Sequence, residues 1–147
     1  MSNKTETKTI STAESCTGGL LASDLVSISG ASKWFRSGIV SYQKDIKVKY
    51  LGVDQELADK TNCVHPEIAR QMAKGVKEMM DSDIGIATTG YAEKWTDSDG
   101  TIHEQICYYC IYQDNTVYQE EIKPLGKMSR NEFRQYIVDT IKIRINK

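Results

Sequence analysis

The sequence predicts a single-domain α/β fold built in layers. Segments rich in β-forming residues alternate along the chain with segments whose apolar residues recur at helical spacing, which is the pattern of an α/β protein. The chain has 147 residues, which fits one domain of ordinary size. Its hydrophobic fraction of 39% is sufficient for a buried core and disfavours disorder. We therefore expect one domain over residues 1–147, with residues 1–8 as a short polar segment before the first strand.

Regular elements are expected from residue 8 to residue 88. The segment from Leu20 to Ile28 carries apolar residues at helical spacing and follows a β-prone run. Pro66 suits the first turn of a helix, and the apolar residues after it again recur at helical spacing. The expected strands lie at residues 8–12, 35–43 and 83–88, and the expected helices lie at residues 18–28, 44–51 and 66–80.

The remainder of the chain predicts a strand hairpin followed by a helix. Residues 91–100 are polar and are expected to form a loop. Two β-prone runs, at residues 102–112 and 116–122, flank a polar turn and predict an antiparallel pair. Ser129 and Glu132 have the spacing of a capping box, which marks the start of a helix.

Composition argues against several classes of function. The net charge is −1, so the overall balance gives no reason to expect nucleic acid as a partner. No apolar run approaches the roughly 20 residues needed to span a bilayer, and no membrane association is expected. Residues 1–8 are polar and charged and do not contain the apolar region of a signal peptide, which favours a cytoplasmic location.

The four cysteines are expected to be reduced, because cytoplasmic proteins rarely keep disulfides. Cys107 and Cys110 form a C-x-x-C pattern inside a β-prone run, where residues three apart face opposite sides of the sheet. This position disfavours a redox pair of the thioredoxin type, which begins a helix. A zinc site that joins this pair to His103, with His65 or Cys63, is a minor alternative because the chain has no second tight ligand pair. We expect neither a metal nor a cofactor.

The most informative segment is a strand-to-helix turn at residues 12–21, Thr-Ala-Glu-Ser-Cys-Thr-Gly-Gly-Leu-Leu. Paired glycines in such a turn expose backbone N–H groups at a positive helix end, which suits a phosphate or a developing oxyanion. The turn also carries three small nucleophilic side chains, those of Ser15, Cys16 and Thr17, after the carboxylate of Glu14. The alternative is an ordinary turn with glycines at the start of the helix.

The heptapeptide at residues 13–19, Ala-Glu-Ser-Cys-Thr-Gly-Gly, resembles the signature of the CinA carboxy-terminal domain family. Further segments are similar to family segments in the same order, at residues 30–35, 38–42, 51–53, 67–73 and 83–90. Members of this family with known activity are nicotinamide-nucleotide amidases. The resemblance therefore implies a three-layer α/β/α sandwich with a mixed sheet. It also implies an amidohydrolase that converts nicotinamide mononucleotide, or a related pyridine nucleotide, to the acid and ammonia.

Amide hydrolysis needs a nucleophile, a base and a group that stabilises the oxyanion. Ser15 is the candidate nucleophile, because it lies beside the paired glycines. Lys47 matches a family lysine and is the candidate base, and Tyr42 is expected to orient this lysine or to donate to the leaving nitrogen. A lysine acts as a base only when its pKa falls from about 10.4. Burial has this effect, and so do nearby cations such as Lys44 and Lys49.

Two alternatives for the catalytic groups stay open. Ser32 also matches a family position and is the rival nucleophile. The two histidines, His65 and His103, lie in no recognised triad motif, so the sequence gives no support to a Ser-His-Asp site.

The substrate is expected to contact several separate parts of the chain. Arg130 and Arg134 resemble a family arginine pair and lie four residues apart on one predicted helix, so both are expected to bind the phosphate. The other expected substrate-binding residues are Thr17, Gly18, Gly19, Ser32, Thr89 and Gly90.

The chain departs from the family pattern at residues 91–101, where bulky and acidic residues replace a glycine- and proline-rich loop. Asp97 and Asp99 would repel a neighbouring phosphate, whereas Tyr91 or Trp95 could stack on a flat ring. We therefore expect a divergent member, and the alternative function is a catalytically inactive relative that binds a nucleotide or a protein. Family members usually carry an extra helix before the first strand, and we expect a second subunit, in a homodimer, to cover the surface left open here.

Overall fold

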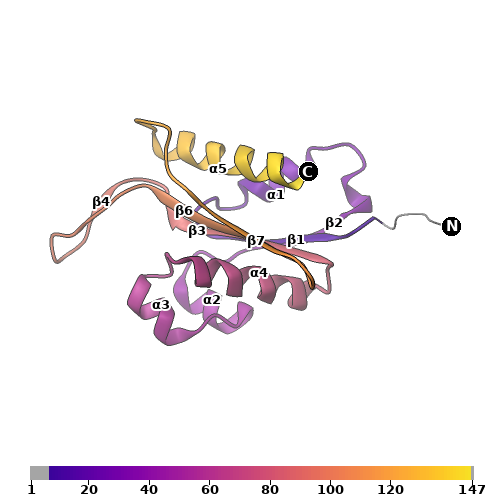
Figure 1. Ribbon diagram of the computed structural model, residues 1–147, viewed down its shortest axis with the longest axis horizontal. Coiled ribbons are helices and arrows are strands. Elements are labelled where there is room, and N and C mark those ends of the chain that lie inside the picture. Colours follow the sequence, from indigo (N-terminus) through magenta and orange to yellow (C-terminus); the bar gives the residue numbers. More distant parts are fainter. Residues whose placement is uncertain (1–6, 147) are drawn as a thin grey trace.

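A five-stranded mixed sheet forms the middle layer of the computed structural model, which describes residues 7–146. In their order across the sheet, the strands are β2 (Phe35–Val40), β1 (Ile10–Glu14), β3 (Ile84–Tyr91), β6 (Ile106–Tyr112) and β7 (Val117–Ile122). One face is covered by α1 (Leu20–Val26) and α5 (Arg130–Ile145), and the other by α2 (Lys44–Leu51), α3 (Gln55–Thr61) and α4 (Pro66–Met80) (Figure 1). The expected three-layer α/β/α fold is confirmed. Of the expected polar segment at residues 1–8, residues 1–6 lie outside the described part of the chain.

The direction of the strands determines where the site residues meet. Strands β2, β1 and β3 run parallel, whereas β6 and β7 run antiparallel to their neighbours. The register pairs Glu14 of β1 with Val40 of β2 and with Thr88 of β3. The segments that follow these residues therefore gather at one edge of the sheet, the edge where α/β proteins commonly bind ligands.

Two apolar clusters hold the helices against the sheet. Leu21 and Phe133 are buried in the cluster beneath α1 and α5, and Met72 of α4 is buried in the cluster on the other face. Strand β6 contributes to both clusters, with Cys107 in the first and Cys110 in the second. The expectation that these two thiols face opposite sides of the sheet is confirmed.

Helices α4 and α5 begin where the sequence predicts. Pro66 is the first residue of α4, and Nδ1 of His65 caps the helix by accepting from the N–H of Glu67 at 3.0 Å. At the start of α5, the N–H of Glu132 donates to Oγ of Ser129 at 3.1 Å, and the N–H of Ser129 donates to the carboxylate of Glu132 at 2.7 Å. This reciprocal pair is the predicted capping box.

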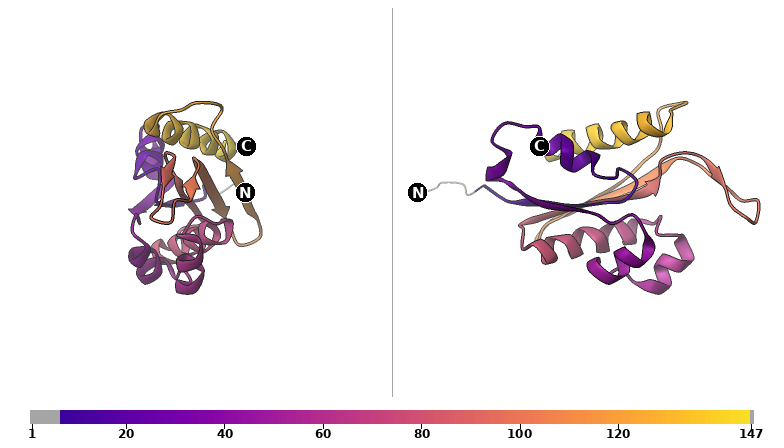
Figure 2. Two further views of the ribbon diagram at one scale, coloured as in Figure 1. Left: turned by 90° about the vertical axis from the view of Figure 1, so that its left-hand side faces the viewer. Right: turned by 180° about the vertical axis from the view of Figure 1, so that it is seen from behind.

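Part of the loop expected at residues 91–100 and the start of the strand expected at residues 102–112 instead form a separate hairpin, and the longer strand begins only at Ile106. The strands of this hairpin, outside the main sheet, are β4 (Trp95–Thr96) and β5 (Ile102–His103). Asp97 stabilises the turn between them, because its Oδ1 accepts from the N–H groups of Asp99 at 2.9 Å and Thr101 at 3.0 Å. The ring of Trp95 stacks on His103 at a centroid distance of 4.7 Å. Figure 2 shows that this hairpin extends away from the helical layers.

Candidate active site

The turn after β1 places Ser15 against a lysine of α2. The N–H of Ser15 donates to the carbonyl oxygen of Thr88 at 3.1 Å, which fixes the start of the turn against β3. Nζ of Lys47 donates to Oγ of Ser15 at 2.9 Å and to the carbonyl oxygen of Tyr42 at 2.7 Å. The structure therefore brings the three expected catalytic residues together.

Lys47 is buried, with only 2% of its surface exposed. Burial disfavours the charged form and lowers the pKa of this lysine, and the nearby Cys63 and Cys16 partly oppose that effect. The neighbouring Lys44 is not the cause, because its own ammonium group pairs with Asp59 at 2.7 Å. Of the two causes expected from the sequence, burial and nearby cations, the structure supports burial.

Glu14, the last residue of β1, closes the turn with its buried carboxylate. Oε1 accepts from the N–H of Gly19 at 3.1 Å, and the two carboxylate oxygens accept from the N–H groups of Leu21 and Ala22 at 2.9 Å. The N–H of Gly18 donates to a carbonyl oxygen within the turn. The expectation that Gly18 and Gly19 offer free N–H groups to an anion is therefore wrong, because acceptors inside the protein occupy both donors.

The two glycines instead allow the sharp bend of the turn. Gly18 and Gly19 have φ angles of 59° and 101°, in the left-handed region that favours glycine. Within residues 7–146, the N–H groups of Cys16 and Thr17 meet no protein acceptor, but Thr17 is fully buried whereas Cys16 is slightly exposed. The side chain of Thr17 is buried and donates to the carboxylate of Glu14 at 2.6 Å, so it supports the turn from inside.

Arg134 of α5 fixes the same two residues from their carbonyl side. Its Nε donates to the carbonyl oxygen of Cys16 at 3.1 Å, and its Nη2 donates to that of Thr17 at 2.7 Å. Nη1 donates to the side chain of Asn131 at 2.9 Å. The expectation that Arg134 shares a phosphate with Arg130 does not agree with this geometry, because the guanidinium of Arg134 is engaged by the turn.

A pocket of about 270 Å³ opens beside the serine–lysine pair. Five expected site residues line it: Ser15, Tyr42, Lys47, Thr89 and Gly90. The hydroxyl of Thr89 donates to the carbonyl oxygen of Cys63 at 2.7 Å and so ties β3 to the segment before α4. Gly90 has no room for a side chain, since a Cβ there would lie 2.1 Å from the carbonyl oxygen of Ile106.

Ser32 lies outside this pocket. It is an exposed residue of the short 3-10 helix η1 (Ala31–Lys33), which precedes β2. The first residue of β2 pairs with Ile10 at the amino end of β1, whereas Ser15 follows the carboxyl end of β1. The two serines therefore lie at opposite ends of the parallel strands, and Ser32 is far from Lys47.

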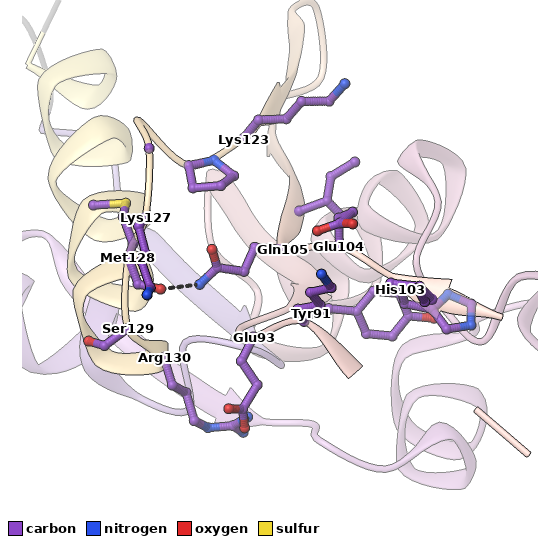
Figure 3. A pocket seen from close by; sticks show the side chains of 15 residues that line it. Tyr91, Glu93, His103, Glu104, Gln105, Lys123, Lys127, Met128, Ser129 and Arg130 are labelled. Atoms are coloured by element: carbon purple, nitrogen blue, oxygen red, sulfur yellow. Dashed lines mark hydrogen bonds and ion pairs between the residues drawn. The ribbon is translucent and has the colours of Figure 1, made fainter. Parts of the chain in front are cut away.

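A larger groove of about 970 Å³ adjoins the pocket (Figure 3). Tyr91 lines both cavities. Arg130 borders the groove, donates to the hydroxyl oxygen of Tyr42 at 3.1 Å and pairs with Glu93 at 2.9 Å. The cationic side chains around the groove are those of Lys94, Lys123, Lys127 and Arg130. This groove was not expected from the sequence, in which its signal is the spacing of cations between residues 123 and 130.

Neither histidine lines the pocket beside Ser15 and Lys47, although His103 lines the larger groove. His65 caps α4, and Nε2 of His103 lies 2.8 Å from the carboxylate of Asp97 within the hairpin. Among residues 7–146, no cluster of three or more His, Cys, Asp or Glu side chains has an arrangement that would hold a metal ion. No helix in the same part of the chain is both long and apolar enough to cross a membrane.

The fold and the site together define a mixed α/β/α domain with a buried serine–lysine pair at the carboxyl edge of its parallel strands. The family model described as the CinA C-terminal domain matches residues 2–140 of the sequence. The chain belongs to this family, as the heptapeptide at residues 13–19 indicates.

Individual relatives agree with this assignment. A CinA-like protein of Kosmotoga olearia is 50% identical over 84 residues, which are 57% of this chain and 20% of that protein. A CinA-like protein of Dictyoglomus thermophilum is 37% identical over 130 residues, which are 87% of this chain and 30% of that protein. The chain thus spans less than a third of the length of these curated relatives. The crystal structure of the competence/damage inducible protein CihA from Agrobacterium tumefaciens matches with a TM-score of 0.83 at 31% identity, over 95% of this chain and 86% of that one.

Proposed function

We propose that this chain is an amidohydrolase that converts nicotinamide mononucleotide, or a related pyridine nucleotide, to the acid and ammonia. The observation that carries the proposal is the 2.9 Å contact between Nζ of Lys47 and Oγ of Ser15. Burial lowers the pKa of Lys47 and thereby increases the fraction of the neutral amine, which is the form that accepts a proton. The substrate class follows from the family resemblance.

In the first half of the reaction, neutral Lys47 removes the hydroxyl proton of Ser15 while Oγ attacks the carboxamide carbon. The carbonyl oxygen becomes an oxyanion, and the N–H group of Cys16, which has no protein acceptor, is the donor that stabilises it. The lysine ammonium then returns the proton to the leaving nitrogen. The C–N bond breaks, ammonia departs, and an ester remains on Ser15.

In the second half, a water molecule attacks the ester and Lys47 takes the proton of that water. The acid leaves as Ser15 regains its hydrogen. Tyr42 assists at the mouth of the pocket: Arg130 donates to its hydroxyl oxygen at 3.1 Å, which leaves the phenolic hydrogen available for the substrate.

The two cavities divide the substrate between them. The pocket beside Ser15 has a volume of about 270 Å³ and takes the pyridine carboxamide. Typical ligand pockets measure about 300–1,000 Å³, so a whole nucleotide needs the adjoining groove as well. Arg130, Lys94 and Lys127 supply the positive charge that binds the phosphate there. Arg134 acts on the other side, by holding the turn in place.

A catalytically inactive relative that binds a nucleotide or a protein is the second candidate. The observation that favours it is the ion pair between Glu93 and Arg130, because this carboxylate occupies the guanidinium that a phosphate needs. Its prediction differs from that of the amidase: the ligand binds, and no ammonia is released.

Ammonia release and calorimetric binding, measured together on nicotinamide mononucleotide, distinguish the two candidates. We expect the wild-type protein to release ammonia, and Lys47→Arg to bind the nucleotide without releasing ammonia, because arginine stays protonated. Lys49→Arg, an exposed position on the same helix, is the matched control and should keep the wild-type rate. Binding by the wild-type protein without ammonia from any pyridine nucleotide would establish the binding module instead.

A further inference from the structure

Two buried thiols meet beside the turn that carries Ser15. The Sγ atoms of Cys16 and Cys107 are 3.8 Å apart. Cys16 follows Ser15 directly, and Cys107 lies on β6, where its register partner on β3 is Gly90. Strand β3 lies between β1 and β6 in the sheet. Gly90, the β3 residue beside Cys107, has no side chain to occupy the space between the two sulfur atoms.

The proposed amide hydrolysis uses neither of these thiol groups. Cys16 is 5% exposed and Cys107 is fully buried. The hydrogen bond between the two thiols lowers the pKa of Cys16, whereas burial raises the pKa of Cys107 well above its ordinary value. The thiolate, which is the form that reacts with oxidants, therefore develops first on Cys16.

We propose that Cys16 and Cys107 form an oxidisable pair, which a hydroperoxide converts to a disulfide, and that this disulfide moves Ser15 away from Lys47. The pair is a modification site, and the modification turns off the serine–lysine site. The second part of this statement, on the loss of amide hydrolysis, rests on the proposed function, and the formation of the disulfide does not.

The chemistry balances with a hydroperoxide as the only oxidant. The Cys16 thiolate attacks the hydrogen-bearing oxygen of the peroxide, and the O–O bond breaks. The other oxygen leaves as an alkoxide, or as hydroxide from hydrogen peroxide, and takes up a proton to give an alcohol or water; Cys16 is then a sulfenic acid. The sulfur of Cys107 attacks the sulfenic sulfur, the S–S bond forms, and the hydroxyl group leaves as water with the thiol proton of Cys107. The two thiols together lose two electrons, and the hydroperoxide gains them.

Closing the disulfide draws the two sulfur atoms together, and we expect the turn to take up the movement. A disulfide bond is about 2.05 Å long, so the sulfur atoms must approach each other from their separation of 3.8 Å. Cys107 sits within a strand that is paired on both sides, whereas Cys16 sits in a turn. The turn therefore moves, and Ser15, bonded directly to Cys16, moves with it and lengthens its 2.9 Å contact with Lys47.

The first test detects the bond itself. The purified full chain, with its four free thiols, is treated with hydrogen peroxide and digested without reduction. We expect mass spectrometry to find the peptides of Cys16 and Cys107 joined, with two hydrogens fewer, and two thiols left for alkylation. Cys110→Ser, which changes a buried thiol three residues along the same strand, should give the same joined peptides. Alkylation of all four thiols after peroxide treatment, or a disulfide between other residues, would overturn the proposal.

The second test links the bond to the turn. Hydrogen exchange of residues 12–21 should change on oxidation of the wild-type protein, revert with dithiothreitol, and stay unchanged in Cys107→Ser and Cys107→Ala. Thermal melting of both variants checks that they fold. A joined pair without any change in exchange would refute the coupling to Ser15.

The third test measures activity. Peroxide should reduce ammonia release by the wild-type protein at least about tenfold, with recovery in dithiothreitol, and leave Cys107→Ser active. A reduced wild-type protein that releases no ammonia would refute the proposed function. The first two tests would still show whether the disulfide forms and whether it moves the turn. Oxidised, joined protein that keeps its full rate would overturn the switch.

Discussion

The side chain of Lys47 is the group on which the proposed chemistry depends, since its burial determines its protonation. The neutral lysine is the active form, and burial lowers its pKa below the ordinary value of about 10.4. We therefore expect kcat/KM for nicotinamide mononucleotide to be low in acid, to rise with pH through this lowered pKa, and to level off above it. A profile of kcat/KM against pH measures the midpoint in the free enzyme. A rate that falls as pH increases through this range would exclude Lys47 as the base.

Ser15 and Ser32 form a matched pair of variants. Ser15→Ala should reduce ammonia release by at least about a hundredfold, because the nucleophile is lost. Ser32→Ala should leave the rate near that of the wild type, since Ser32 lies at the opposite end of the parallel strands. Thermal melting of both variants separates lost chemistry from lost structure. The reverse pattern of rates would transfer the nucleophilic role to Ser32.

At the scale of elements, helix α5 carries two arginines, one turn apart, with different roles. Arg134 holds the carbonyl groups of the catalytic turn, so Arg134→Lys should lower kcat more than it raises KM. Arg130 borders the groove, so Arg130→Ala should mainly raise KM for nicotinamide mononucleotide, with a larger effect at low salt. Steady-state kinetics of the two variants test this division, and identical effects on both parameters would contradict it.

The turn of the hairpin, at residues 97–101, is expected to be separate from the chemistry, because it lines neither the pocket nor the groove. It extends away from the helical layers, and Asp97 accepts hydrogen bonds from its own turn. Replacing both Asp97 and Asp99 with Asn should keep ammonia release within about threefold of wild type, because neither side chain lines the pocket or the groove. If the double variant instead binds the nucleotide much more tightly, the hairpin closes over the phosphate and this assignment is wrong.

Predictability from sequence differs among the elements for physical reasons. Local signals located α4 and α5, because Pro66 and the Ser129–Glu132 box act within one turn of chain. The hairpin escaped detection because each of its strands has two residues, too few to show alternation, and Asp97 forms its turn with side-chain contacts. Helix α3, with seven residues, is likewise too short to show a helical period, although Asp54 caps it.

At the scale of the whole molecule, the described residues 7–146 leave a mainly apolar hollow of about 320 Å³ near the amino end of β1. Ile10, Leu25, Ile28 and Trp34 line it, and the neighbouring Val26 is 53% exposed. Exposed apolar surface of this kind commonly marks a site of association. We expect a homodimer that covers this hollow, and Ile28→Glu should shift it toward monomer without unfolding. Sedimentation velocity measures the oligomeric state of the wild-type protein and of the variant. A monomeric wild-type protein would contradict the expectation.

The candidate site was only partly predictable, because it is assembled across the whole chain. The resemblance to the family indicated Ser15 and Lys47. Their contact joins residues that are 32 positions apart in the sequence, and no local pattern predicts it. The partners of Gly18, Gly19 and Arg134 were misjudged, since a sequence does not show which acceptor a donor meets. The groove depends on the approach of the hairpin to the segment before α5, which only the tertiary structure supplies.

Glu14 has a consequence for handling and redesigning this protein. Its carboxylate is an internal counterion that already neutralises the start of α1, so phosphate or sulfate in a buffer should compete with substrate only in the groove. The Glu14→Gln exchange would keep the size of the side chain and remove its negative charge. The positive start of α1 would then lose its counterion inside a closed turn, and the protein should melt at a lower temperature.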